Sequence, residues 1–364
     1  MNTEKMQAMV AYLNHAQLDA AIISNWHDVA YLTGFESDPI ERVLVLALFA
    51  DRDPFLFGPA LEINAMRESG WPYAAFGYDD HENPWALIAQ HLGAVKRVGI
   101  ESDDLTVARF NALQSALGDV ALTTDVSGHL NNLRLIKTDA EIDKMIAAGH
   151  DADLAVQFGI EALQIGASER GVAASLEYRL KQQGVAGMSF ESLVQFGEHA
   201  ADPHGSTSLR ELKAGELVLF DLGTMTNGYA SDVTRTVAFG EISDEARRIY
   251  DVVLAAQLAA QNAAKIGMTA AELDAVARDV IEAAGYGQYF SHRLGHGLGA
   301  SVHEYPSIMA GNDLVLQENM VFSIEPGIYV PGVAGVRIED SVYLTKDGAV
   351  PFTHFSKELI IIEP

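Results

Sequence analysis

Four acidic residues interrupt two otherwise apolar strand pairs, and they restrict what this chain can fold into more than any other feature. Asp221 and Asp232 lie in LVLFDLGTMTNGYASDVTRTVAF, and Glu325 and Glu339 lie in MVFSIEPGIYVPGVAGVRIEDSVYL. An ionised carboxylate in an apolar setting costs several kcal/mol unless it is paired or bound to a metal. Asp is also depleted from strands in general. A fold that gathers these residues must therefore provide cations as well.

The spacing of the first acidic pair follows from the turn between its two members. Asn227 and Gly228 form the preferred dipeptide for a two-residue hairpin loop, because both positions take positive φ. With this loop, Asp221 lies opposite Thr234, and Asp232 lies one diagonal step away on the same face. Diagonal neighbours are roughly 7 to 8 Å apart between Cα atoms. That gap suits two carboxylates that reach toward a shared ion, provided that no bulge breaks the register.

The second acidic pair, Glu325 and Glu339, is predicted to repeat this arrangement around a loop at residues 331–335, and Pro326 favours extended backbone at Glu325. His296, in LGHGLG, lies between the two pairs in the sequence. Four carboxylates and one imidazole suit manganese or magnesium, and the imidazole also admits cobalt, zinc or iron. One divalent ion would leave about two negative charges unbalanced, so the charge balance favours a two-metal site.

The order Asp, Asp, His, Glu, Glu, within FDLGTMTNGYASDVTRT, HRLGHGLGASVHEYP, SIEPGIY and VRIEDSV, resembles the pita-bread metallopeptidase family. That family holds methionine aminopeptidase, aminopeptidase P and prolidase. The resemblance extends from Arg134 to the C-terminus, and more loosely over the N-terminal part. In length and N-terminal domain the chain is most similar to the short bacterial prolidases of the lactic-acid-bacterial type. The resemblance therefore implies a dipeptidase that hydrolyses Xaa-Pro dipeptides and releases proline.

The same resemblance implies a role for each residue of the metal site. Asp221 would bind one ion alone, His296 and Glu325 would bind the other, and Asp232 and Glu339 would bridge both. A metal-bridging hydroxide would attack the scissile carbonyl, with Glu325 as the catalytic proton shuttle. Two manganese ions per subunit are expected, with cobalt or zinc as alternatives.

Two further catalytic histidines are implied by the resemblance. His303, in VHEYP, and His204, in ADPHG, match family histidines that hydrogen-bond the substrate carbonyl or the tetrahedral oxyanion. Such hydrogen bonds gain strength in a site that excludes water. Without the resemblance, His204 would be interpreted as a turn residue after Pro203.

A dipeptidase must also hold the free carboxylate of its substrate, which a guanidinium does with two parallel hydrogen bonds. The substrate-binding candidates are Arg293, Arg337 and Arg42. On a strand, Arg337 shares the face of Glu339, because side chains alternate with period two. Orientation of the metal carboxylates is therefore an equally good interpretation of Arg337. Arg42 is the weaker candidate, because a solvated loop charge explains it better.

The domain organisation follows from the pattern of strands and helices. Residues 1–130 alternate short apolar strands with amphipathic stretches, which indicates an N-terminal α/β domain. Residues 131–364 are expected to form an α+β pita-bread catalytic domain. The strands predicted in the first domain are 18–24, 43–48, 54–57, 73–76, 97–100 and 120–123, with helical stretches at 83–92 and 105–117.

The second domain is predicted to be a doubled unit. Helices at 139–165 and 168–183 precede the Asp pair, and helices at 244–265 and 270–284 precede the Glu pair. Thr138 with Glu141, and Thr269 with Glu272, are predicted to form capping boxes that open two of these helices. Such a repeat would place the four carboxylates around a pseudo-twofold axis.

Charge and composition exclude several classes of partner. The formal net charge of −26 argues against nucleic acid and against an anionic membrane, since both favour basic patches. The apolar run at residues 43–50 is far below the ~18 residues of a membrane span. Cysteine is absent, which fits a reducing cytoplasm, the expected location. A homodimer is implied by the resemblance only.

Several alternatives remain open at this point. Aminopeptidase P would use the same metals on longer Xaa-Pro peptides. Methionine aminopeptidase usually lacks a domain like residues 1–130, and a creatinase-type amidinohydrolase lacks the metal ligands that this chain retains. A non-catalytic peptide-binding module is the alternative from another class of protein, because this fold also serves as a binding scaffold.

Overall fold

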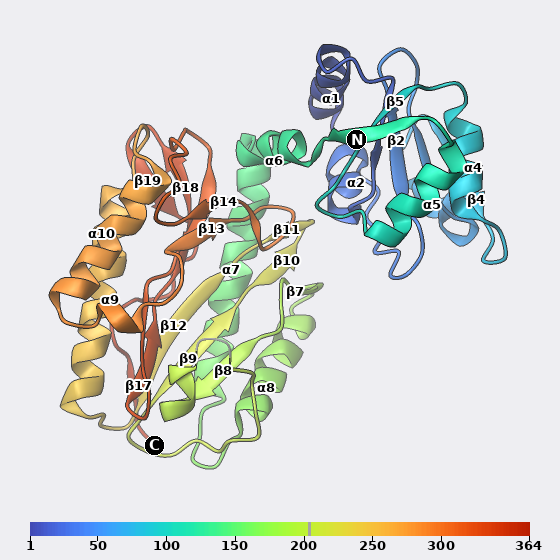
Figure 1. The fold of residues 1–364 in the computed structure, drawn as a ribbon. Coiled ribbons are helices and arrows are strands. Elements are labelled where there is room, and N and C mark those ends of the chain that lie inside the picture. The colour runs from blue at the N-terminus through green and yellow to red at the C-terminus, as the bar shows by residue number, and fades with distance from the viewer. Residues whose placement is uncertain (203–204) are drawn as a thin grey trace. The chain divides into compact units, whose positions relative to one another are not determined.

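The computed structural model describes residues 1–202 and 205–364, and the chain divides into two compact units, Met1–Leu133 and Arg134–Pro364 (Figure 1). The first unit is built on a six-stranded sheet with the order β4-β3-β2-β1-β5-β6. Its strands are β1 (Ala20–Ile23), β2 (Val45–Phe49), β3 (Phe55–Pro59), β4 (Ala74–Tyr78), β5 (Arg97–Ile100) and β6 (Ala121–Asp125). The predicted strands are confirmed, and their ends shift by at most two residues.

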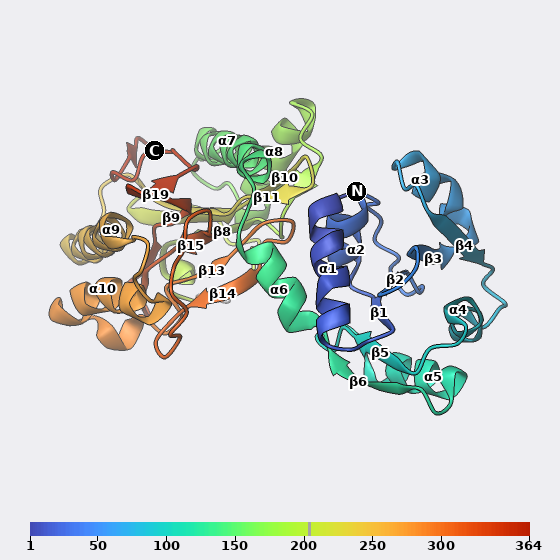
Figure 2. The same ribbon diagram turned by 90° about the horizontal axis from the view of Figure 1, so that it is seen from above.

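Helices cover both faces of this sheet (Figure 2). They are α1 (Thr3–His15), α2 (Trp26–Thr33), α3 (Ile63–Glu68), α4 (Pro84–Leu92) and α5 (Val107–Leu117), with a 3-10 turn at Ala60–Glu62. Apolar residues of α1, α2 and α3 join one core, and those of α4 and α5 join another. β1 is buried along its whole length because it contributes alternate side chains to both cores. Helix α6 (Ser127–Leu135) leads into the second unit.

The second unit repeats a pair of helices. The helices are α7 (Asp139–Glu161), α8 (Glu169–Gln182), α9 (Asp244–Ala263) and α10 (Ala270–Ala283), with 3-10 turns at Gly197–Ala201 and Gly287–Tyr289. Both predicted capping boxes are confirmed, Thr138 with Glu141 before α7 and Thr269 with Glu272 before α10. Within the described ranges, no helix combines the length and the apolar character that crossing a membrane requires.

The strands of the second unit form two larger sheets, with the orders β20-β12-β9-β8 and β14-β13-β15-β18-β19, and two small ones, β11-β10-β7 and β16-β17. Their bounds are β7 (Gly187–Met188), β8 (Leu193–Phe196), β9 (Glu216–Leu222), β10 (Thr224–Thr226), β11 (Tyr229–Ala230), β12 (Val233–Phe239), β13 (Gly295–Gly297), β14 (Glu304–Ile308), β15 (Val321–Ile324), β16 (Gly327–Val330), β17 (Ala334–Arg337), β18 (Asp340–Thr345), β19 (Gly348–Pro351) and β20 (Ile361–Ile362). Helices α7 and α8 share a core with the first sheet, and α9 and α10 with the second. The helix pairs flank the strands in Figure 1, as the predicted doubled unit requires.

The register predicted for the Asp hairpin is confirmed. Asn227 and Gly228 form its loop with φ of 54° and 76°, so Thr226 pairs with Tyr229. The same register continues from β10 and β11 into β9 and β12, where Thr234 lies opposite Asp221. No bulge intervenes in this pairing, because every pair keeps the same offset.

The Glu hairpin differs from the prediction in two respects. Its loop is residues 331–333, shorter than expected, because Ala334 already pairs with Val330 and Gly335 with Tyr329. Glu325 and Glu339 lie in breaks between strands, after β15 and before β18. The flanking pairs place these two residues opposite each other, not on a diagonal. Pro326 explains one break, since proline has no N–H to donate to a ladder.

The capping box before α10 gives a test of local stability. Thr269→Ala should lower the free energy of unfolding by about 1 kcal/mol, because the Thr269 hydroxyl accepts the Glu272 backbone N–H. Thr269→Ser keeps this acceptor and should unfold like the wild type in urea. Equal loss in both variants would contradict the assignment of the hydroxyl as a cap.

Candidate metal centre

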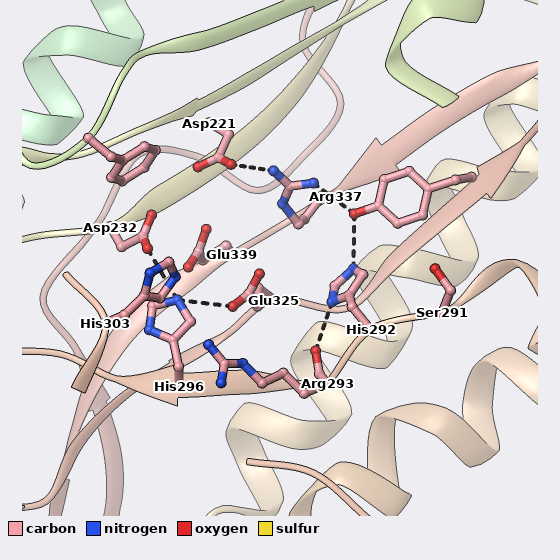
Figure 3. A pocket seen from close by; sticks show the side chains of 12 residues that line it. Asp221, Asp232, Ser291, His292, Arg293, His296, His303, Glu325, Arg337 and Glu339 are labelled. Atoms are coloured by element: carbon pink, nitrogen blue, oxygen red, sulfur yellow. Dashed lines mark hydrogen bonds and ion pairs between the residues drawn. The ribbon is translucent and has the colours of Figure 1, made fainter. Parts of the chain in front are cut away.

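The acidic residues of both hairpins surround one cavity of about 350 Å³ in the second unit (Figure 3). Its lining residues are Phe190, Asp221, Asp232, Ser291, His292, Arg293, His296, His303, Glu325, Tyr329, Arg337 and Glu339. All five residues expected to bind metal, together with His303 and two of the arginines, are among them. The structure therefore brings together side chains that are up to 118 residues apart in the sequence, as Asp221 and Glu339 are.

A buried group of three ligand types lies at the centre of this cavity. Donor atoms of Asp232, His296 and Glu339 all lie within 4.8 Å of one another. His296 Nε2 is 3.4 Å from Asp232 Oδ2 and 3.3 Å from Glu325 Oε1. Figure 3 shows the four carboxylates and the imidazole pointing into the same space. This geometry makes Asp232, His296 and Glu339 a candidate metal site, with Glu325 close by.

Unsatisfied oxygens show that the cluster fits a cation. Asp232 Oδ1 and Glu339 Oε1 are buried and have no hydrogen-bond partner among the described residues. Burial raises the pKa of both carboxyls well above the usual value, and the charges of neighbouring carboxylates raise it further. Two adjacent carboxylates with orphaned oxygens need either protons or metal, and hard oxygen donors suit divalent ions. The residues present therefore fit the divalent metal that such a ligand set binds.

His296 is placed by tight backbone packing. Its backbone N–H donates to Ser323 Oγ at 3.0 Å, and its Nδ1 lies 3.1 Å from the Gly297 carbonyl oxygen. A carbonyl only accepts, so Nδ1 carries a proton, and Nε2 is the ring nitrogen that faces the carboxylates. Gly295 is required here, because a Cβ at this position would lie 1.9 Å from the Ser323 carbonyl oxygen.

Arg337 connects the two hairpins. Its guanidinium forms an ion pair with Asp221 and donates to Thr234 Oγ1 at 3.1 Å and to the Tyr329 hydroxyl at 2.7 Å. The Thr234 hydroxyl in turn donates to Glu339 Oε2 at 2.7 Å. Burial opposes the charge of Arg337, but its oxygen neighbours more than offset this and raise its pKa. Burial also raises the pKa of Asp221, and Arg337 limits the increase.

A chain of hydrogen bonds continues from Arg337 to His292. Nδ1 of His292 donates to the Arg293 carbonyl oxygen at 2.7 Å, so Nε2 accepts from the Tyr329 hydroxyl at 3.0 Å. Burial lowers the pKa of His292 and raises that of Tyr329 to about 12. Both side chains are therefore neutral at pH 7. The hydrogen bonds run in one direction, from Arg337 to Tyr329, from Tyr329 to His292, and from His292 to the Arg293 carbonyl oxygen.

His303 faces the candidate metal ligands from a separately anchored loop. Its ring centroid lies 4.1 Å from that of His296, with the planes at 69°. Burial lowers the pKa of His303 to about 4, and the neighbouring His296 and Arg293 lower this pKa further. The next residue, Glu304, is buried and pairs with Arg134 and with Lys137, whose Nζ is 3.1 Å away. This ion cluster holds the loop that carries His303.

Of the three other predicted site residues, Arg293, Arg42 and His204, only Arg293 is among the described residues that line the cavity. Arg293 lines the cavity and donates to Ser307 Oγ at 2.7 Å. Arg42 belongs to the first unit and pairs there with Asp80 at 2.9 Å, at an exposed position. His204 lies outside the described residues.

Sequence reasoning missed the roles of three residues in the Arg337 network, two of which, His292 and Tyr329, line the cavity. They are His292, Tyr329 and Thr234. A signal for two of them was present: Tyr329 has even spacing from Glu325 along one hairpin arm, and Thr234 is two residues after Asp232. His292 carried no comparable signal, because it lies in an irregular segment before β13.

The metal-site domain and the preceding domain both match known family models. Residues 143–346 match metallopeptidase family M24, and residues 5–136 match the creatinase/prolidase N-terminal domain. The chain therefore belongs to metallopeptidase family M24, with the pita-bread fold of that family, and is a hydrolase. Membership in this family implies divalent metal ions, in accord with the buried ligand cluster.

Relatives and solved structures cover the chain from end to end. An Xaa-Pro dipeptidase from Lactobacillus helveticus is 51% identical over 369 residues, covering 100% of this chain and 99% of the relative. The crystal structure of a prolidase from Thermococcus sibiricus has a TM-score of 0.93 at 34% identity, covering 100% and 99% of the two chains. An X-Pro aminopeptidase from Thermotoga maritima is similar as well, with a TM-score of 0.85 at 29% identity over 95% and 98%.

Removing the charge of Glu304 tests whether its ion pairs anchor the loop that carries His303. Glu304→Gln should lower the free energy of unfolding by about 3–5 kcal/mol at pH 7, because it leaves two buried cations without their carboxylate. Burial alone would raise the pKa of Glu304, but Lys137 and Arg134 more than offset this effect and hold the pKa at about 2, below its ordinary 4.5. Its stabilising effect is therefore complete above pH 4.5 and is lost as the pH falls from 4.5 toward 2.

Urea unfolding of the wild type and Glu304→Gln at pH 7 and pH 4 measures this effect. The difference between the two proteins should be smaller at pH 4. Glu318→Gln is the control, because Glu318 pairs with Lys346 only at an exposed position. A Glu304 variant as stable as this control at pH 7 would show that the cluster does not anchor the loop.

Proposed function

We propose that this chain is an Xaa-Pro dipeptidase that releases proline from dipeptides with the help of two divalent ions. The observation that carries the proposal is a small cavity lined by four carboxylates and one imidazole, in which Asp232, His296 and Glu339 form a buried cluster with orphaned carboxylate oxygens. The similarity over the full length to an Xaa-Pro dipeptidase supports the substrate class. Manganese is the expected ion, with cobalt or zinc as alternatives.

Five residues would hold the ions. Asp221 would serve one ion, His296 and Glu325 the other, and Asp232 and Glu339 both. Two ions held in this way would activate a water molecule and polarise the substrate carbonyl. The total charge of four carboxylates supports this count, since two divalent ions balance it.

The side chains around the ions would move the protons. Glu325, whose Oε1 accepts from Ser323 Oγ at 3.0 Å, would take a proton from water and pass it to the leaving nitrogen. His303 would donate a hydrogen bond to the oxyanion from its position beside His296. His204 would act at the substrate carbonyl.

Arg293 is the preferred partner for the substrate carboxylate. The guanidinium of Arg337 already bonds three side chains, Asp221, Thr234 and Tyr329, so it would orient the metal carboxylates. Arg293 lines the same cavity and has only one side-chain hydrogen bond within the described part of the chain, to Ser307. Its remaining N–H groups suit a bidentate carboxylate contact. Arg42 belongs to the first unit and would contribute to substrate binding only from there. We expect the protein to form a homodimer and to act in the cytoplasm.

The chemistry of an Xaa-Pro dipeptide suits a metal site of this kind. An Xaa-Pro bond has a tertiary amide nitrogen without N–H, so enzymes that grip an extended backbone bind it poorly. A site that acts on the carbonyl itself does not need this N–H. The cavity of about 350 Å³ is at the small end for ligand sites, which suits a dipeptide.

Kinetics with peptides of two lengths test the proposal. In manganese, kcat/KM for an Xaa-Pro dipeptide should exceed that for the matching Xaa-Pro tripeptide by roughly tenfold or more. A charge-assisted hydrogen bond to the terminal carboxylate contributes about 1.5–3 kcal/mol, and a longer peptide would misplace that group. Higher kcat/KM for the tripeptide would favour an aminopeptidase. Peptide binding without metal and without hydrolysis would favour the binding module.

Variants of the bridging carboxylates test the metal roles. Asp232→Asn and Glu339→Gln should abolish hydrolysis and lower the manganese content measured by elemental analysis, because each loses a charged ligand. His303→Ala is the matched comparison, and it should retain manganese while turnover falls by about 10²–10³-fold. Normal turnover in either carboxylate variant would disprove the assigned roles. Loss of manganese in His303→Ala would instead make His303 a ligand.

A further inference from the structure

A second buried ion cluster lies on the reverse face of the two segments that carry Asp232 and Glu339. Thr234 on β12 directs its hydroxyl to the Glu339 carboxylate. The next residue, Arg235, therefore points to the opposite face of the strand, because side chains alternate. There it forms an ion pair with Asp340 at 2.6 Å, and Asp340 directly follows Glu339 in the sequence. Both side chains are about 1% exposed.

All five N–H groups of Arg235 are used. Nε and one N–H of Nη2 donate to the Phe355 carbonyl oxygen at 2.9 and 2.7 Å, and the other N–H of Nη2 donates to Asp340. The two N–H groups of Nη1 donate to the backbone carbonyl oxygens of Thr234, at 2.9 Å, and of Glu339. A guanidinium has five N–H donors in a fixed plane, so no donor is left over. Because every N–H group of this rigid guanidinium has an acceptor, Arg235 fixes the positions of these acceptors relative to one another.

The acceptors belong to both hairpins of the metal site. The Thr234 carbonyl oxygen also accepts the backbone N–H of Glu339 at 3.0 Å. Ser341 Oγ donates to the carbonyl oxygen of Asp232 at 2.7 Å. These bonds form a backbone junction between the segment that begins at Asp232 and the segment that follows Glu339. Arg235 closes this junction from the reverse face.

We propose that Arg235 is a positioning residue for the metal centre, which sets the separation of Asp232 and Glu339 through the carbonyl groups of Thr234 and Glu339. The inference rests on the proposed two-metal function, because these carboxylates are its two bridging ligands. Arg235 touches neither substrate nor metal in this proposal. It acts on the ligand carboxylates through the backbone that carries them.

Asp340 fixes the guanidinium in this role. Its Oδ1 also accepts from the Thr353 hydroxyl at 3.0 Å, and its Oδ2 pairs with Lys357. The C-terminal segment thereby supplies the Phe355 carbonyl and Lys357 to the same cluster. A lysine in place of Arg235 would keep the charge beside Asp340, but one ammonium group cannot reach carbonyl groups on two segments.

Titration of metal-free protein with Mn²⁺ alone tests the proposal. The signal of free aqueous Mn²⁺ in electron paramagnetic resonance gives the affinity, and the spectrum of bound Mn²⁺ reports the coupling between two ions. The variants are Arg235→Lys and Arg235→Met. Arg210→Met is the control, because Arg210 also has a carboxylate partner, Glu216 at 2.5 Å, but does not bond Thr234 or Glu339.

Both Arg235 variants should bind Mn²⁺ about 10–100-fold more weakly, the usual effect of losing a group that orients a ligand. Their coupled spectrum should change, and at saturating Mn²⁺ their kcat should fall with little change in KM. Arg210→Met should keep the wild-type affinity and spectrum. Thermal unfolding without metal measures the general loss of stability separately.

Wild-type affinity and spectrum in Arg235→Lys would overturn the proposal, even if its melting temperature fell. If Arg235→Met does not fold, Arg235→Lys alone decides. A wild-type protein that binds no Mn²⁺ would overturn the proposed function and this inference together. A wild-type protein that binds two ions, with unchanged binding in the Arg235 variants, would overturn this inference alone.

Discussion

Excess negative charge in a buried cavity is the constraint on which the second unit depends. Asp221, Asp232, Glu325 and Glu339 converge there, and within the described residues Arg337 is the one guanidinium that bonds any of their side-chain carboxylates. Each buried ion costs several kcal/mol before it is compensated. The orphaned oxygens of Asp232 and Glu339 show that hydrogen bonds alone do not supply that compensation. Folding and cation binding are therefore linked, since the ligand set exists only in the folded state.

Local rules predicted the parts of the fold that depend on neighbours in sequence. The Asn227-Gly228 turn determines the register of the Asp hairpin, because a two-residue loop fixes the pairing that follows as long as no bulge intervenes. The capping boxes at Thr138 and Thr269 are likewise local. The loop of the Glu hairpin was predicted too long, because Gly335 already pairs with Tyr329 and only Gly332 of the two glycines has positive φ.

The network around Arg337 shows what sequence patterns could not supply. Whether this guanidinium binds substrate or orients ligands depends on which groups surround it, and those groups come from Asp221, Thr234 and Tyr329 on three different strands. Spacing joins Asp221 with Thr234 in one hairpin and Tyr329 with Arg337 in the other. No spacing rule joins one hairpin to the other, because those contacts form only when the two halves of the domain pack together. The donor-to-acceptor direction of the hydrogen bonds through His292 depends on a single backbone carbonyl oxygen, and the sequence does not predict it either.

The two halves of the domain are related by repetition, yet their junction is not a continuous sheet, because β12 and β18 belong to different sheets. Two arginines with opposite orientations join them: Arg337 bonds Asp221 on the cavity side, and Arg235 bonds the Glu339 carbonyl on the reverse side. Each reaches acceptors on both halves with one rigid fork, which a lysine cannot do. A metal site assembled from two separate hairpins needs such a connection, because a shift of about 1 Å between the halves is enough to spoil the geometry of ligands that both must share.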